Sequence, residues 1–225
     1  MAELNDAALL LRRIPYSETS LICHFLTEKH GRIVLMARGA RRAKSAFRAS
    51  LAPLHELQLS WKEGRSDMGT LLDAQRHQPL LSEAKSLSGL EILALVSRLY
   101  QDGDPEGYLQ TRYALDLIEA REETEGTHAA CWYLLHAAGW IGDLTHCWQC
   151  GKPIDGHENM YWHQSLLRCA ACGAGEPVVP GLRKSIDGVM QQATVHLTRR
   201  DAASWQHMIE LVLKEHGVRF TANFS

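Results

Sequence analysis

The sequence predicts a multi-domain α+β protein. We expect an N-terminal β-barrel of the OB-fold type over residues 1–80 and an all-α domain over residues 81–225, with an inserted four-cysteine zinc module at about residues 145–175. Three observations support this prediction. Five short apolar runs occupy the first eighty positions, helical periodicity begins near Ser82, and two Cys-x-x-Cys pairs interrupt the helical part.

Composition and charge describe a globular protein with two unlike halves. Hydrophobic residues make up 45% and charged residues 22% of the 225 positions, which is ordinary for a folded chain of one or two domains. Up to Leu81 there are twelve basic and eight acidic residues, a net charge of +4. The remainder has twelve basic and eighteen acidic residues, a net charge of −6, so the whole chain carries −2. This asymmetry indicates two modules with different roles.

The N-terminus and the cysteine usage bear on the compartment. Acidic residues and only a short apolar run precede Arg12 and Arg13, which is not the pattern of a secretory signal, and no stretch has the length of a membrane span. We therefore expect a cytoplasmic protein in which the six cysteines serve as metal ligands or reduced thiols. Cys23 and Cys131 lie in apolar patterns and are predicted to be core residues.

Five strands are expected in the first domain. They correspond to the apolar runs at 6–14, 19–27, 31–39, 53–61 and 68–76. Five strands with turns at this frequency fit a small closed barrel better than a sandwich, which has about seven strands. The OB-fold is the five-stranded barrel to expect, and its strands and loops commonly bind oligonucleotides.

A basic segment joins the third and fourth of these strands. It carries five cationic residues, and no acidic residue occurs from Lys29 to His55. The five are Arg38, Arg41, Arg42, Lys44 and Arg48. Their positive potential predicts a path for nucleic-acid phosphates, on which Phe47 is placed to stack on a base. The alternative is a solvated basic loop whose phenylalanine packs into the barrel.

From Ser82 onward the apolar residues recur at helical spacing. The expected helices cover residues 81–101, 107–123, 127–144, 181–193 and 198–217. The third is nearly all apolar and is predicted to be a buried central helix ended by Gly139 and Gly142. The last is predicted to be capped by Thr198.

The two cysteine pairs are the most specific chemical signal. Cys147 and Cys150 are followed, after eighteen residues, by Cys169 and Cys172, a gap within the range expected of a thiolate zinc site. Each pair can aim two sulfurs at an ion about 2.3 Å away, and four thiolates leave no open position for water or substrate. We therefore predict one structural Zn²⁺. Two disulfides are the alternative, and they would require an oxidising compartment.

Three stretches of the chain together resemble the RecO family of bacterial recombination mediators. In the N-terminal region the similar positions are Arg13, Tyr16 to Ser20, Gly31, Arg32 and Ala37 to Arg41. In the helical region they are Gly139, Trp140 and Leu144 to Cys147, which lead into the double Cys-x-x-Cys. The resemblance covers nearly the whole chain in order.

The resemblance implies a non-enzymatic DNA repair protein. Members of that family bind single- and double-stranded DNA, anneal complementary strands, and work with RecR to help load RecA onto strands coated by single-strand-binding protein. The basic segment inherits the DNA-contact role, with Arg13 and Arg32 as further candidates, and the four cysteines inherit zinc. For the acidic tail of single-strand-binding protein, Arg112 and Arg121 are the candidate contacts. A cytoplasmic, nucleoid-associated location follows.

Two other classes of protein are the alternatives. A zinc deaminase requires His-x-Glu, Pro-Cys-x-x-Cys and an open metal position, whereas His157 and Glu158 are adjacent and Arg168 precedes Cys169. We therefore expect no enzymatic activity. A zinc-ribbon transcription regulator, or another zinc-stabilised nucleic-acid-binding adaptor, is the second alternative. A regulator that reads bases needs a basic element near the zinc, whereas the charges around the cysteines balance.

Overall fold

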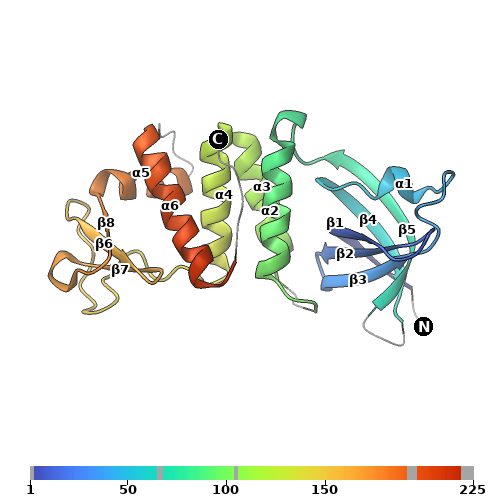
Figure 1. The fold of residues 1–225 in the computed structure, drawn as a ribbon, viewed down its shortest axis with the longest axis horizontal. Coiled ribbons are helices and arrows are strands. Elements are labelled where there is room, and N and C mark those ends of the chain that lie inside the picture. The colour runs from blue at the N-terminus through green and yellow to red at the C-terminus, as the bar shows by residue number, and fades with distance from the viewer. Residues whose placement is uncertain (1–2, 65–67, 104–105, 192–196, 219–225) are drawn as a thin grey trace. The chain divides into compact units, whose positions relative to one another are not determined.

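The computed structural model describes residues 3–64, 68–103, 106–191 and 197–218. The chain divides into two compact units, Met1–Glu119 and Ala120–Ser225, which are described separately below. The first unit contains a β-barrel and the helices α1, α2 and α3, and the second contains the helices α4, α5 and α6 and a small sheet (Figure 1). No helix within the described ranges is long and apolar enough to cross a membrane.

A closed five-stranded barrel forms most of the first unit (Figure 1). Its strands are β1 (Glu3–Pro15), β2 (Leu21–Thr27), β3 (Gly31–Ala37), β4 (His55–Lys62) and β5 (Met68–Pro79). Around the barrel the order is β1-β2-β3-β5-β4, and every pair is antiparallel except β3 with β5. This is the OB-fold barrel that the sequence predicts.

The barrel closes because β1 pairs with two neighbours. Ala8 lies opposite Thr27 of β2 and Leu57 of β4, and a register shift between Leu10 and Arg12 lets the strand bend from one partner toward the other. Alternate side chains point inward and form the core, in which Cys23 is fully buried, as predicted.

Helices complete the first unit. They are the short α1 (Phe47–Ser50), the 3-10 turn η1 (Glu83–Lys85), α2 (Ser86–Leu99) and α3 (Tyr108–Ala120). A Cβ atom at Gly89 of α2 would lie 2.3 Å from the Leu81 side chain and 2.7 Å from that of Leu54, so a larger residue there would force the two leucine side chains to shift. Arg112 of α3 forms an ion pair with Glu56 of β4. The compact unit therefore extends beyond residue 80, because α2 and α3 contact the barrel.

Three helices and a small sheet form the second unit. The helices are α4 (Glu123–Ala137), α5 (Pro180–Met190) and α6 (Arg199–Glu215). The sheet has the order β7-β6-β8 and consists of β6 (Met160–His163), β7 (Leu166–Arg168) and β8 (Glu176–Val178), with the 3-10 turn η2 (Ala170–Cys172) between β7 and β8. Three buried tryptophans join these elements: the Trp132 ring centroid lies 5.6 Å from that of Trp162 and 6.1 Å from that of Trp205.

The helix predictions hold, with differences at the ends. The buried α4 stops at Ala137, because Gly139 takes a φ of +73° and its N–H donates to His136 O. Cys131 is fully buried, as predicted. Thr198 caps α6, since its hydroxyl accepts the Asp201 N–H at 3.1 Å. Residues 192–193 of the predicted fourth helix lie outside the described residues. The three short strands of the sheet were not predicted.

Candidate metal and nucleic-acid sites

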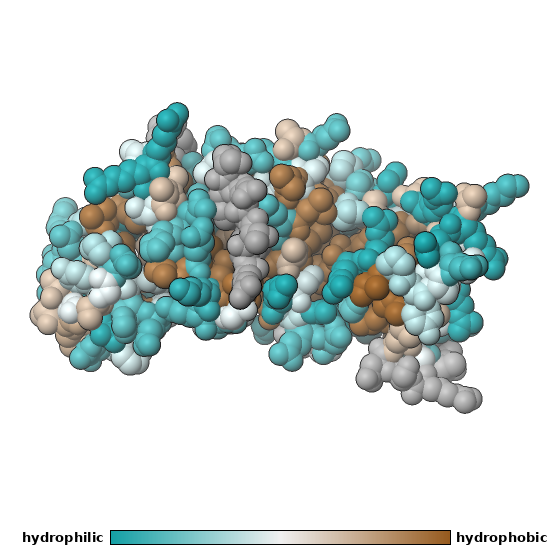
Figure 2. All heavy atoms as spheres, in the orientation of Figure 1, coloured by the Kyte–Doolittle hydropathy of each residue, from teal (hydrophilic) through white to brown (hydrophobic). Residues whose placement is uncertain are grey.

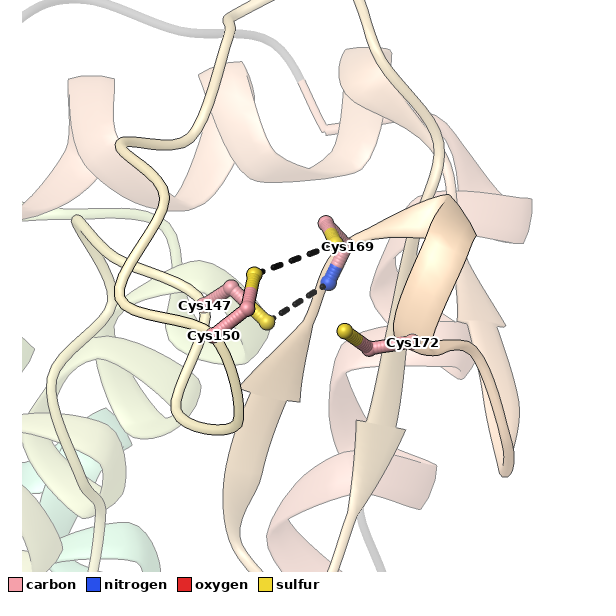
Figure 3. A group of neighbouring side chains, drawn as sticks. All are labelled: Cys147, Cys150, Cys169 and Cys172. Atoms are coloured by element: carbon pink, nitrogen blue, oxygen red, sulfur yellow. Dashed lines mark hydrogen bonds between the residues drawn. The ribbon is translucent and has the colours of Figure 1, made fainter.

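The four cysteine sulfurs of the second unit converge on one point (Figure 3). The four Sγ atoms lie within 4.8 Å of one another, and the Sγ atoms of Cys150 and Cys169 are 3.8 Å apart. Ligands at about 2.3 Å from a tetrahedral ion are about 3.8 Å from each other, whereas a disulfide requires about 2.05 Å. All four are free thiols, so their spacing fits a metal ion and not a pair of disulfides.

Backbone hydrogen bonds hold the first cysteine pair in a tight turn. The Cys147 N–H donates to Lys152 O and the Gly151 N–H returns to Cys147 O, each at 2.8 Å. Gly151 takes a φ of +70°, which a glycine adopts without steric cost. The turn therefore brings the sulfurs of Cys147 and Cys150 to the same side.

The second pair follows β7, and two contacts join it to the first. The Trp148 N–H donates to Leu167 O at 2.9 Å, and the Cys169 N–H points at the Cys147 sulfur at 3.3 Å. A Cβ at Gly173 would lie 2.9 Å from the Tyr161 ring and 3.2 Å from Ala170 O, so a larger residue there would press against that ring as the chain leaves the cluster. Two segments far apart in the sequence thus form one cluster.

The thiols differ in their readiness to ionise. Burial raises the pKa of Cys147, but the backbone N–H groups of Cys169, Cys150 and Gln149 outweigh this effect and lower the pKa to about 6. The protonated Cys172 thiol is favoured because it donates to the sulfurs of Cys150 and Cys169, and this raises the pKa of Cys172 to about 12. Crowded sulfurs cannot all be thiolates on their own, so the cluster needs a cation to neutralise it. The four cysteines could therefore hold a metal ion.

The basic segment follows β3 as an exposed loop and continues into α1, which carries Arg48; residues 38–48 are together called the basic loop below. Hydrophilic residues gather around α1 in this region (Figure 2). All five predicted cationic residues are exposed. Within the described part of the chain, four of them have no ion-pair or hydrogen-bond partner for their side chains: Arg38, Arg42, Lys44 and Arg48. None of the residues that the structure describes therefore neutralises their positive charge.

The loop is nevertheless ordered by hydrogen bonds. Turns close it from within, since the Arg42 N–H donates to Gly39 O and the Ser45 N–H donates to Arg42 O, each at 3.0 Å. Arg41 binds the neighbouring turn between β1 and β2: its N–H donates to Thr19 O at 2.9 Å and its guanidinium to Ser17 O at 2.5 Å. Arg41 thus fixes the loop while its neighbours face solvent.

Three further predicted residues pack or bind within the protein. Phe47 is half-buried and packs on the barrel core, which is the alternative considered for its ring. The Arg13 guanidinium donates to Leu51 O at 2.8 Å, next to α1, although the residue remains exposed. Arg32 is only 17% exposed at its side chain. It forms an ion pair with Asp102 at 2.7 Å and donates to two carbonyls at the end of α2, those of Ser97 and Tyr100. The DNA roles of Arg13 and Arg32 stay predictions.

The two candidate contacts for an acidic tail are also engaged. Arg112 pairs with Glu56. Arg121 donates to Val189 O at 2.7 Å and forms an ion pair with Glu125 at 3.1 Å. Within each unit these side chains hold elements together, so binding a tail would require them to leave their partners.

Sequence reasoning missed Tyr16. Its side chain is 61% exposed, on the turn to which Arg41 is bonded. The sequence around an aromatic residue in a turn does not indicate whether its ring is buried or exposed. Its position beside the basic loop appears only once β1, β2 and β3 pair.

An OB-fold barrel with an exposed basic loop, followed by a helical unit with four cysteines that could hold a metal ion, defines a two-part protein of the OB-fold class. Comparison with known proteins narrows this class. Residues 1–80 match the family described as Recombination protein O N terminal, and residues 83–216 match Recombination protein O C terminal. The chain therefore belongs to the RecO family of DNA repair proteins.

Individual relatives agree with the family match. The chain is 33% identical over 190 residues to the DNA repair protein RecO of Acidithiobacillus ferrooxidans, covering 78% of this chain and 70% of the relative. It is 34% identical over 159 residues to that of Actinobacillus succinogenes, covering 68% and 66%. Over 103 residues it is 39% identical to that of Laribacter hongkongensis, covering 45% and 42%.

Proposed function

We propose that this protein is a DNA-binding recombination mediator that catalyses no covalent chemistry. It would anneal complementary strands and, with RecR, help load RecA onto strands coated by single-strand-binding protein, at the nucleoid. Membership of the RecO family supports the general role. The observation that carries DNA binding is the set of four exposed cationic side chains that have no partner among the described residues and lie on an ordered basic loop.

The mechanism would be electrostatic. Cationic side chains that no acidic residue neutralises can replace the counterions of a phosphate backbone, and this release of counterions favours binding without reading sequence. Arg41 keeps the loop in place through the Thr19 and Ser17 carbonyls, so little entropy is lost when DNA binds. Base pairing between strands, rather than the protein, would then select complementary sequences.

We propose Zn²⁺ as the ion of the cysteine cluster. Four sulfurs at tetrahedral spacing are the donor set that this ion prefers in structural sites. Four thiolates would fill the coordination sphere, so the ion would stabilise the fold and would not activate water. Its role would be to join the turn at Cys147 to the segment at Cys169.

The test of DNA binding is a salt series with a fluorescent single-stranded oligonucleotide. The variant replaces Arg38, Arg42 and Lys44 with alanine and retains Arg41, which orders the loop. Four phosphate contacts on a single strand, one for each cation without a partner among the described residues, give a slope of log affinity against log salt of about −2.8, and the single contact that the variant retains gives about −0.7. We expect the variant to bind more weakly and to have the shallower slope.

A matched control removes three charges elsewhere on the first unit. Lys62, Arg76 and Arg98 are exposed on β4, β5 and α2, and their replacement with alanine lowers the net charge equally. If binding depends only on net charge, the two variants will weaken alike. Equal binding by the loop variant and the unaltered protein would overturn the proposal.

A further inference from the structure

An aromatic ring is exposed beside the basic loop. Among the described Phe, Tyr and Trp side chains, those of Tyr16 and Trp148 are exposed, and Tyr16 is the one in the first unit. Burying an aromatic side chain is favourable, so a ring that remains 61% exposed contributes little to packing. A flat apolar surface is therefore free to accept a partner.

The turn that carries Tyr16 is ordered. The Tyr16 N–H donates to Ser20 O at 3.1 Å, and the Ser20 N–H donates to the Ser17 hydroxyl at 3.2 Å. These bonds close the connection between β1 and β2. Because the turn is already fixed, the ring is presented at a small cost in conformational entropy when it is bound.

The same turn is bonded to the basic loop. The Arg41 guanidinium donates to the carbonyl of Ser17, which directly follows Tyr16, and consecutive Cα atoms are about 3.8 Å apart. A strand whose phosphates contact the loop near Arg41 thus has its bases within reach of the ring. Phe47, the other aromatic residue of this region, packs on the barrel core and cannot serve.

We infer that Tyr16 stacks on an unpaired base of the strand that the basic loop binds, and that this contact favours single-stranded over double-stranded DNA. The inference rests on the proposed function and specifies the form of DNA that the loop takes. Every base has a π-face, so the contact tolerates any sequence. In a duplex those faces are covered by neighbouring base pairs, and the ring has no partner except at an end.

The test compares three ligands: a single-stranded oligonucleotide, a duplex of the same sequence, and a strand of equal length whose central nucleotides are abasic. For Tyr16→Ala we expect about a tenfold loss of affinity for the single strand, near the lower end of the range for one base–aromatic stack. Affinity for the duplex and the abasic strand should change by less than about twofold. Tyr16→Phe should keep the affinity, because it keeps the ring. Leu109→Ala, which removes a side chain 67% exposed on α3, should bind all three ligands normally.

The salt dependence separates this inference from the proposal on which it rests. Tyr16→Ala should leave the salt slope unchanged, since no phosphate contact is lost, whereas the loop variant should flatten it. Normal single-strand binding by Tyr16→Ala, or an equal loss on all three ligands, would overturn the inference and leave the electrostatic proposal standing. If the loop variant binds normally, the proposed phosphate surface is wrong. If Tyr16→Ala binds DNA normally but no longer binds RecR or single-strand-binding protein, the inference is wrong and the ring contacts protein instead.

Discussion

The basic loop of the barrel and the cysteine cluster of the helical unit both concentrate charge, but in opposite ways. In the loop, backbone hydrogen bonds and Arg41 provide the order, and four cationic side chains remain without partners among the described residues. In the cluster, the charged atoms themselves converge, with all four sulfurs within 4.8 Å. One region directs its charge toward solvent, and the other directs it inward.

The difference distinguishes groups that bind a partner from groups that hold the fold. A charge that the protein leaves unneutralised on an ordered support is available to a ligand of opposite charge. A charge that the protein surrounds with donors or ligands is already committed, and removing its partner destabilises the fold. Substitutions of groups that hold the fold test this distinction, and they are given in order of decreasing expected effect.

The largest effect is expected from removing a cysteine ligand. Cys169→Ser should abolish metal binding and unfold the second unit while the barrel stays folded. Binding of structural zinc contributes about 10–16 kcal/mol in zinc-finger peptides at pH 7, and this is the upper limit of the loss. Metal content and the fluorescence of the buried Trp132, Trp162 and Trp205 report the change. Cys131→Ala, which removes a buried sulfur outside the cluster, should keep the metal. Full metal content in Cys169→Ser would contradict the assignment of the ligands.

A smaller effect is expected at His128, a buried residue of α4. Its ring stacks on Trp205 with centroids 5.8 Å apart. Burial lowers its pKa to about 4, against the opposing influence of Thr124 and Glu210. The unfolded chain, with a pKa near 6.5, therefore binds more protons between pH 6.5 and pH 4. The contribution of the neutral His128 to the free energy of unfolding should be fully present above pH 6.5. It should be lost, by about 3 kcal/mol, as the pH drops through this window.

The measurement for His128 is the midpoint of denaturant unfolding across that pH range, compared with His128→Gln. The glutamine variant should be less stable at neutral pH but should lose less on acidification. The cysteine cluster also takes up protons on acidification, and its contribution cancels because it is common to both proteins. Parallel pH profiles would show that the imidazole does not cause the loss.

Local signals made much of this architecture predictable. Alternation of apolar residues, interrupted by turns, indicated the five strands, and the side chains of these strands do form a common core. The spacing within each cysteine pair is a local property of one turn, so Cys147 and Cys150 could be named from sequence as members of a cluster that could hold a metal ion. The Thr198 cap has the same character, because it contacts Asp201 three residues later.

Tertiary neighbours decided what the sequence could not indicate. The family resemblance made Arg32 a candidate DNA contact, a role that stays a prediction. The sequence does not indicate that its side chain binds within the first unit, because its partners lie on and after α2. Phe47 was a candidate for stacking, yet it packs inward, while Tyr16 is the exposed ring. The strands β6 to β8 have only three or four residues, too few for alternation to register.

The smallest effect is expected at Arg32, which sharpens the contrast with the loop arginines. Its guanidinium is committed to the Ser97 and Tyr100 carbonyls and to Asp102, so Arg32→Ala should destabilise the first unit by about 2 kcal/mol, a typical value for charged hydrogen bonds. The salt slope of DNA binding should stay at its original value, because a committed cation contributes no phosphate contact. Denaturant unfolding measures the stability of the variant, and the same salt series measures the slope of its DNA binding. A flattened slope with unchanged stability would instead place Arg32 on the DNA path and extend the phosphate surface from the loop along β3.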